Sequence, residues 1–191
     1  FLSCELLDGT AYKKDPDSMD ISKSDSSANS GSINSGSGKS HVPIAILSHG
    51  FCQSKYRSLV YAEIFLKMGF VVIIYDHRNH GLSGKAYTTM GFYEKFDLKK
   101  IVDWCYNTYG PDCKIVTHGE SMGAATVLLH LGIDNRVACA IADSAYSDLE
   151  ELLRHQFKCY YHLPKFLIPI ESIVTYLRAG FRYRDVSPIS V

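Results

Sequence analysis

Residues 119–123 read Gly-Glu-Ser-Met-Gly, a Gly-x-Ser-x-Gly motif that can present a serine hydroxyl as a nucleophile. An apolar run, 114–117, leads into the motif and a helix-type run, 124–131, leaves it. This order predicts a sharp turn between a strand and a helix, with the two glycines allowing close approach. The backbone N–H of Met122 would then lie at a helix N-terminus, where an acyl oxyanion is stabilised. The motif predicts that Ser121 attacks a carbonyl carbon; an ordinary turn rich in small residues is the alternative.

The composition of the chain limits what it binds. Its 191 residues are 46% hydrophobic and carry zero formal net charge. That is one globular domain, long enough to bury a core. The charge balance argues against nucleic acid or an anionic membrane surface as the main partner. No apolar run approaches the roughly 20 residues of a transmembrane helix, so no span is expected within the chain.

The six cysteines are scattered without a C-x-x-C pair, which favours a reducing compartment and a cytoplasmic location. The first residue is Phe1 rather than Met, so processing or missing upstream residues are expected, and a membrane anchor or export signal there stays an alternative.

No metal or cofactor is predicted. The spacing of His155, Cys159 and His162 suggests a metal, but all three fit the surface of an aromatic helix, with no further ligand to complete a set. The Gly-Ser-Gly-Lys-Ser sequence at 36–40 lacks the first glycine of a phosphate-binding loop, where Ile33 stands.

The chain divides into an N-terminal segment, 1–41, and a core, 42–191. Residues 1–13 fit a short strand or a short helix equally well, and 15–40 are rich in Ser, Gly, Asn and Asp, which predicts a flexible linker. From residue 148 to 181 the sequence is aromatic and helix-like, and we expect a cap-like insertion there.

Between these segments, continuous apolar runs alternate with amphipathic helical patterns. This alternation predicts an α/β fold whose mostly parallel sheet is covered by helices on both faces. The expected strands are 42–47, 70–75, 113–117 and 137–142, and the expected helices are 56–68, 94–106 and 124–131.

Five motifs in order resemble the α/β-hydrolase superfamily, in particular its bacterial serine-aminopeptidase-like and esterase branch. The resemblance covers about residues 42–191. It implies an oxyanion hole made by the backbone N–H groups of Phe51 and Met122 beside the nucleophile Ser121. The motifs are Ser48-His49-Gly50-Phe51, the Asp-His-Arg-Asn-His-Gly-Leu-Ser run at 76–83, His118 to Gly123, Ala142 to Tyr146, and Val186-Ser187-Pro188-Ile189.

The family places its acid and its histidine after later strands, in the order Ser, Asp, His. The strands that would carry them are missing before Val191, so we expect both groups beyond it. Asp143 holds a position that some related lipases use for the acid, although an Asp in such a turn more often bonds nearby backbone. His155 and His162 lack a strand to position them. His49 and His80 are expected to bond loop backbone.

The resulting hypothesis is a serine hydrolase that cleaves a small carboxylic ester through an acyl-enzyme on Ser121. Without a histidine, this piece alone should be nearly inactive. Two alternatives stay open. An aminopeptidase would need an acidic pocket, which Glu150, Glu151 and Glu171 could supply, and a non-catalytic module would bind a ligand or partner under the cap. The sequence does not predict the oligomeric state.

Overall fold

The fold is taken from a computed structural model that describes residues 1–8, 41–160, 162, 164 and 166–191. The linker expected at 15–40 lies outside the described residues, so it stays a prediction.

The centre of the molecule is a five-stranded sheet in the order β1-β3-β2-β4-β5. All neighbouring strands are parallel except β1, which pairs antiparallel with β3. The mostly parallel sheet is therefore confirmed, and the undecided N-terminal segment contributes an edge strand. The strands are β1 (Cys4–Asp8), β2 (Pro43–Ser48), β3 (Val71–Tyr75), β4 (Lys114–Glu120) and β5 (Cys139–Asp143).

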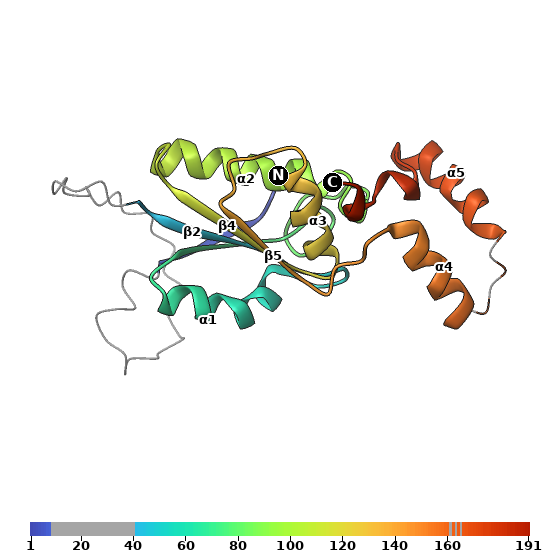
Figure 1. Ribbon diagram of the computed structural model, residues 1–191, viewed down its shortest axis with the longest axis horizontal. Coiled ribbons are helices and arrows are strands. Elements are labelled where there is room, and N and C mark those ends of the chain that lie inside the picture. The colour runs from blue at the N-terminus through green and yellow to red at the C-terminus, as the bar shows by residue number, and fades with distance from the viewer. Residues whose placement is uncertain (9–40, 161, 163, 165) are drawn as a thin grey trace.

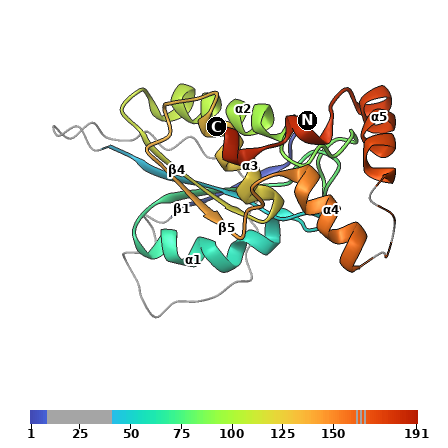
Figure 2. The same ribbon diagram turned by 45° about the vertical axis from the view of Figure 1, so that its right-hand side comes forward.

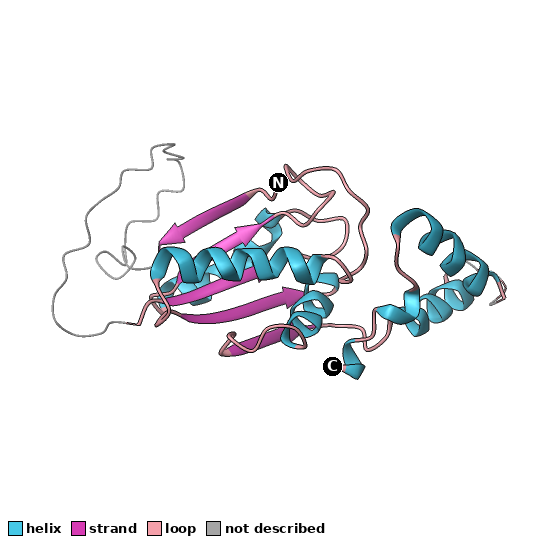
Figure 3. Cartoon of the chain, turned by 90° about the horizontal axis from the view of Figure 1, so that it is seen from above, coloured by secondary structure: helices cyan, strands magenta, loops and turns pink. Residues whose placement is uncertain are grey.

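Helices cover both faces of this sheet, as Figure 1 shows: α1 lies on one face, and α2 and α3 lie on the other. Two further helices, α4 and α5, extend beyond one end of the sheet (Figures 2 and 3). The α-helices are α1 (Leu59–Lys67), α2 (Glu94–Tyr109), α3 (Met122–Leu131), α4 (Leu149–Cys159) and α5 (Leu167–Ala179), and the short 3₁₀ helices are η2 (Lys55–Ser58), η3 (Tyr183–Asp185) and η4 (Pro188–Ser190).

The central strands are buried on both faces because successive side chains of a strand point in opposite directions. In β2, Ile44 and Ile46 belong to the core under α2 and α3, whereas Ala45 and Leu47 belong to the core over α1. All four side chains are fully buried. Continuous apolar strands therefore predicted two-sided cover correctly at the centre of the sheet.

At the β5 edge that prediction was wrong. The apolar run 137–142 was expected to be covered on both faces, yet Cys139 is exposed and Ile141 is 42% exposed. Among the described strands, β5 pairs only with β4. Although α3 packs against β5, the strand has a described neighbouring strand on one side only, and its open edge leaves these side chains exposed.

A third apolar cluster joins α4 and α5 to the end of α3. Leu129 of α3 packs there with Leu149, Phe157 and Ile168. Asp148 caps α4, because its carboxylate accepts the backbone N–H of Glu151 at 3.0 Å. The two helices occupy the range of the expected cap, whose role as a separate unit stays a proposal.

The described helices include none with the length and apolar character to cross a bilayer. All six cysteines are free; Cys105 and Cys113 are buried, and the other four are exposed.

Candidate active site

Ser121 lies in the turn between β4 and α3, with φ 53° and ψ −111°. A non-glycine residue with positive φ is strained and persists only where its surroundings fix it. Here the Ser121 N–H donates to the Asp143 carbonyl at 2.9 Å, and its carbonyl accepts the Ala125 N–H at 3.0 Å. The expected sharp turn between a strand and a helix is confirmed. The side chain is exposed and does not cap α3.

The two glycines of the motif are required by backbone contacts. A Cβ added to Gly119 would collide with the backbone of Gly123, and one added to Gly123 would collide with the carbonyls of Ser48 and His49. The start of α3 therefore packs directly against the end of β2. This contact brings the loop after β2 beside Ser121.

The N–H groups expected to form an oxyanion hole lie around this junction. Met122 is the first residue of α3, so its N–H belongs to the first turn, whose donors have no partner within the helix. Within the described part of the chain, neither this N–H nor that of Phe51 donates to a protein acceptor. Phe51 and Ser121 line the same pocket. Their roles stay a prediction.

That pocket has a volume of about 690 Å³ and lies between the Ser121 turn and the α4 and α5 segment. Aromatic, aliphatic and neutral polar side chains line it, and none of the described lining residues is charged. They are Phe51, Asn79, Ala86, Tyr87, Thr88, Met90, Ser121, Tyr146, Leu149, Leu152, Leu153, Gln156, Thr175, Phe181 and Tyr183.

Asp143 uses its carboxylate in other contacts. Its Oδ2 accepts the Tyr61 hydroxyl at 2.8 Å, and its Oδ1 accepts the Ser144 hydroxyl at 2.9 Å. These two bonds lower the pKa of Asp143, that from Tyr61 the most. The expectation that the Asp143 carboxylate bonds nearby backbone was wrong, because its two partners are hydroxyl groups.

All eight histidines lie in the described part of the chain, and none is hydrogen-bonded to Ser121. His118 is buried on the α1 face, where its ring lies 4.1 Å from that of Tyr61 and burial lowers its pKa. His155 lies on α4 and contacts Cys159, with 3.8 Å between Nδ1 and Sγ. Among the described residues, therefore, no histidine is hydrogen-bonded to the candidate nucleophile as a general base would be.

His49, His77 and His80 form a cluster behind the loop after β2, with ring centroids 4.7 to 6.4 Å apart. His49 and His80 bond loop backbone, as the sequence predicted. That the three rings meet could not be predicted from the sequence, because two motifs separated along the chain contribute them.

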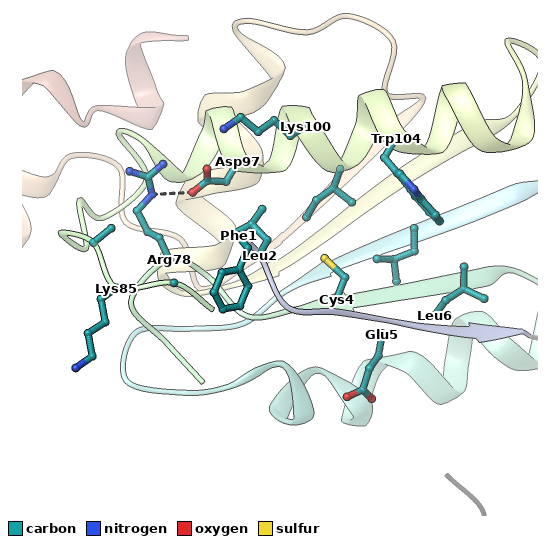
Figure 4. Close-up of a pocket in the computed structure, with 14 residues that line it drawn as sticks. Phe1, Leu2, Cys4, Glu5, Leu6, Arg78, Lys85, Asp97, Lys100 and Trp104 are labelled. Atoms are coloured by element: carbon teal, nitrogen blue, oxygen red, sulfur yellow. Dashed lines mark hydrogen bonds and ion pairs between the residues drawn. The ribbon is translucent and has the colours of Figure 1, made fainter. Parts of the chain in front are cut away.

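No three His, Cys, Asp or Glu side chains of the described residues come together in an arrangement that could hold a metal ion. A second cavity, of about 610 Å³, lies between β1 and α2 (Figure 4). Phe1, Leu2 and Trp104 line it, and the Arg78–Asp97 ion pair, 2.6 Å long, lies at one end. Ser121 does not line this cavity, so the candidate active site is the pocket that Ser121 does line.

Comparison with known proteins agrees with this geometry. The family model of serine aminopeptidases, S33, matches residues 39–168, which include the Ser121 turn and the loop after β2. The chain belongs to the serine aminopeptidase S33 family. Solved esterases and other α/β-hydrolases share its fold, so the expected α/β-hydrolase superfamily is confirmed.

Two relatives show how far the similarity extends. It is 42% identical over 149 residues to the Bacillus subtilis protein YqkD, which bears the description "uncharacterized"; the match covers 76% of this chain and 49% of YqkD. It is 31% identical to an esterase of Pyrococcus furiosus, with a TM-score of 0.57, covering 73% of this chain and 54% of the esterase. The chain spans about half the length of these relatives.

A more distant structure shows the fold alone. Est1E of Butyrivibrio proteoclasticus, solved with ferulic acid bound, is 19% identical with a TM-score of 0.57, and the match covers 81% of this chain and 53% of Est1E.

Proposed function

We propose that this S33-family chain carries the nucleophile of a serine hydrolase that cleaves small carboxylic esters. The observation that supports it most is the conformation of Ser121, a strained residue held between β4 and α3 at the mouth of a pocket. Strained backbone concentrates at functional sites. The similarity to the esterase of Pyrococcus furiosus supports the same reaction class.

In the proposed mechanism, the Ser121 Oγ attacks the ester carbonyl carbon while a histidine takes its proton. The N–H groups of Phe51 and Met122 stabilise the negative oxygen of the tetrahedral intermediate. Collapse of the intermediate breaks the bond to the alcohol oxygen, which leaves with the proton from the histidine. Water then hydrolyses the acyl group from Ser121 by the same steps in reverse.

The neutral pocket favours an ester over a peptide with a free amine. An aminopeptidase needs an anionic group to bind the ammonium of its substrate, yet no carboxylate of the described residues lines the Ser121 pocket. Glu150 pairs with Arg154 on α4, and Glu171 interacts with the Tyr183 hydroxyl without lining the pocket. An uncharged acyl group fits the aromatic and aliphatic lining.

We further propose that the catalytic histidine and its acid come from residues outside this sequence, because none of the eight histidines is bonded to Ser121. The oxyanion hole and substrate binding alone provide about 10³-fold acceleration over water. The 191-residue chain should therefore hydrolyse esters only feebly. A reducing compartment is proposed from the six free cysteines.

A fluorophosphonate probe tests both parts of this proposal. Ser121 should label slowly in the 191-residue chain and fast in a version extended by the residues that follow in its gene, and Ser121→Ala should abolish both signals. Fast labelling of the short chain would contradict the outside origin of the histidine. An extended version that stays unlabelled would refute the hydrolase and favour a non-catalytic binding module.

The substrate class is tested on the same extended version. We expect turnover of p-nitrophenyl acetate and butyrate and little turnover of aminoacyl p-nitroanilides. The reverse preference would favour the aminopeptidase.

A further inference from the structure

In the loop after β2, the peptide groups on both sides of Phe51 are hydrogen-bonded to histidines, His49 on one side and His80 on the other. The carbonyl of the Gly50–Phe51 peptide lies 2.7 Å from the Nδ1 of His49. The N–H of the Phe51–Cys52 peptide donates to the Nε2 of His80 at 3.3 Å. Because a peptide group is planar, fixing its carbonyl also fixes the direction of its N–H. The Phe51 N–H, which the proposed function places in the oxyanion hole, is therefore oriented through its neighbours.

The contacts of His80 determine which of its nitrogens carries the proton. Its Nδ1 lies 2.9 Å from the Arg78 carbonyl, which can only accept, so Nδ1 must donate. Its Nε2 faces the Cys52 N–H, which can only donate, so Nε2 must be the unprotonated acceptor. His80 is thus fixed as the neutral Nδ1–H tautomer. His49 follows the same logic, because its Nε2 accepts the N–H of His77 at 3.0 Å.

The segment that His80 holds is strained. Cys52 has a φ of 58°, a conformation that non-glycine residues adopt only when their surroundings impose it. On its other side the loop is closed by Gln53, whose Oε1 accepts the Gly50 N–H at 2.9 Å. Within the described residues, the side chain that holds the amide of this strained residue is His80.

We propose that His80 is a positioning residue: as its Nδ1–H tautomer it holds the Phe51–Cys52 peptide, while His49 holds the Gly50–Phe51 peptide, and together they fix the direction of the Phe51 N–H. The inference rests on the proposed function for the role of Phe51. The hydrogen bonds that carry it do not depend on that function.

The ring of His80 is packed among other aromatic rings. Its ring faces those of His49, at 5.3 Å, and His77, at 6.4 Å, and the edge of Phe51 at 5.9 Å. His77 is fully buried with no hydrogen-bond partner on either nitrogen, and burial, then His49 and His80, hold its pKa well below the usual range. The charged groups near the cluster are Arg78, which pairs with Asp97, and the carboxylates of Asp76 and Glu120.

The tautomer is tested first in the 191-residue chain, with no need for activity. Long-range ¹H–¹⁵N correlation spectra at pH 7.5 should show His80 with a protonated Nδ1 and an unprotonated Nε2. An Nε2–H tautomer would overturn the proposal.

Substitutions then separate the hydrogen bond from the ring. His80→Phe keeps a ring but removes the acceptor, and we expect exchange of the Cys52 amide to accelerate about five-fold or more, as the loss of one hydrogen bond predicts. His80→Gln supplies an acceptor oxygen and should restore most of the protection. His155→Phe makes the same substitution at an exposed histidine of α4 and is the matched control. It should leave exchange of the Cys52 amide unchanged. Equal exchange in the Phe and Gln variants would refute the role of the acceptor.

The functional arm uses the extended version and its fluorophosphonate labelling at Ser121. His80→Phe should slow labelling by about ten-fold or more, up to the 10²–10³-fold loss that accompanies removal of a whole oxyanion donor, and His80→Gln should recover it. Normal labelling of His80→Phe would overturn the positioning role. Absence of labelling in the unchanged protein would instead refute the proposed function, while the spectra still decide the hydrogen bond.

Discussion

At the scale of single residues, the site depends on backbone contacts more than on side-chain bonds. Ser121 is held in a strained conformation by main-chain bonds to β5 and to α3, and its neighbours are glycines because carbonyl groups occupy the space of a Cβ. The motif could therefore be recognised from sequence, since the same contacts dictate residue type and spacing. The partners of Asp143 could not, because Tyr61 comes from a distant helix.

Replacing Gly123 with Ala tests this close approach. Helix propensity alone would stabilise the chain by about 1 kcal/mol, because Gly123 lies within α3. The added methyl group would meet the carbonyls of Ser48 and His49, so we expect a net destabilisation of about 1–3 kcal/mol. Urea unfolding measures it. Gly110→Ala is the control for backbone strain alone, since its φ is 86° and no atom lies near its Cβ position. A more stable Gly123→Ala would contradict the close contact.

Asp143 provides a second test at this scale. Because Tyr61 and Ser144 occupy its carboxylate, we expect Asp143→Asn to leave fluorophosphonate labelling of the extended version nearly unchanged. Loss of a triad acid lowers turnover by about 10⁴-fold. A decrease of that size would make Asp143 the catalytic acid.

At the scale of elements, apolar pattern predicted what lies at the centre of the sheet and failed at its edges. β2 and β3 were recognised because both of their faces are buried. β1 alternates between exposed and half-buried residues, a pattern too short to separate strand from helix, and its antiparallel partner lies far along the chain. The exposure of β5 depends on whether another strand pairs with its open edge, and the residues of β5 alone do not predict that.

The junction between β4 and α1 predicts a loss of stability in acid. Burial lowers the pKa of His118, against the opposing effect of Asp143 and Glu120. Below about pH 6.5 the unfolded chain therefore binds a proton at this residue that the folded chain does not. The free energy of unfolding must then fall as the pH drops from 6.5 toward the lowered pKa, by at most about 1.4 kcal/mol per pH unit.

Urea unfolding at pH 7.5 and 5.5 measures this slope. His118→Phe keeps the contact with Tyr61 and Phe65 but cannot bind a proton, so its slope should be smaller than that of the unchanged chain. The exposed His155→Phe should leave the slope as it is. Equal slopes for all three proteins would show that His118 does not titrate between these values.

At the scale of the whole molecule, the candidate site lies where two parts meet. The layered sheet ends at the Ser121 turn, and α4 and α5 stand beyond it (Figures 1 and 3). The pocket draws its lining from both parts, so its shape depends on how the two helices dock through Leu129 and its apolar neighbours. An edge strand such as β5 presents unpaired backbone groups, which favours association with another strand.

A charge placed on β5 tests whether this edge causes association. We expect the 191-residue chain to associate as its concentration rises, because β5 has one described neighbour and Ile141 is 42% exposed. Ile141→Lys should reduce this association, since a lysine on an edge strand opposes pairing. Sedimentation velocity over a concentration series measures it. Ile64→Lys, an exposed position on α1 away from the edge, is the matched control: if it reduces association as much as Ile141→Lys does, general surface charge and not the β5 edge is responsible.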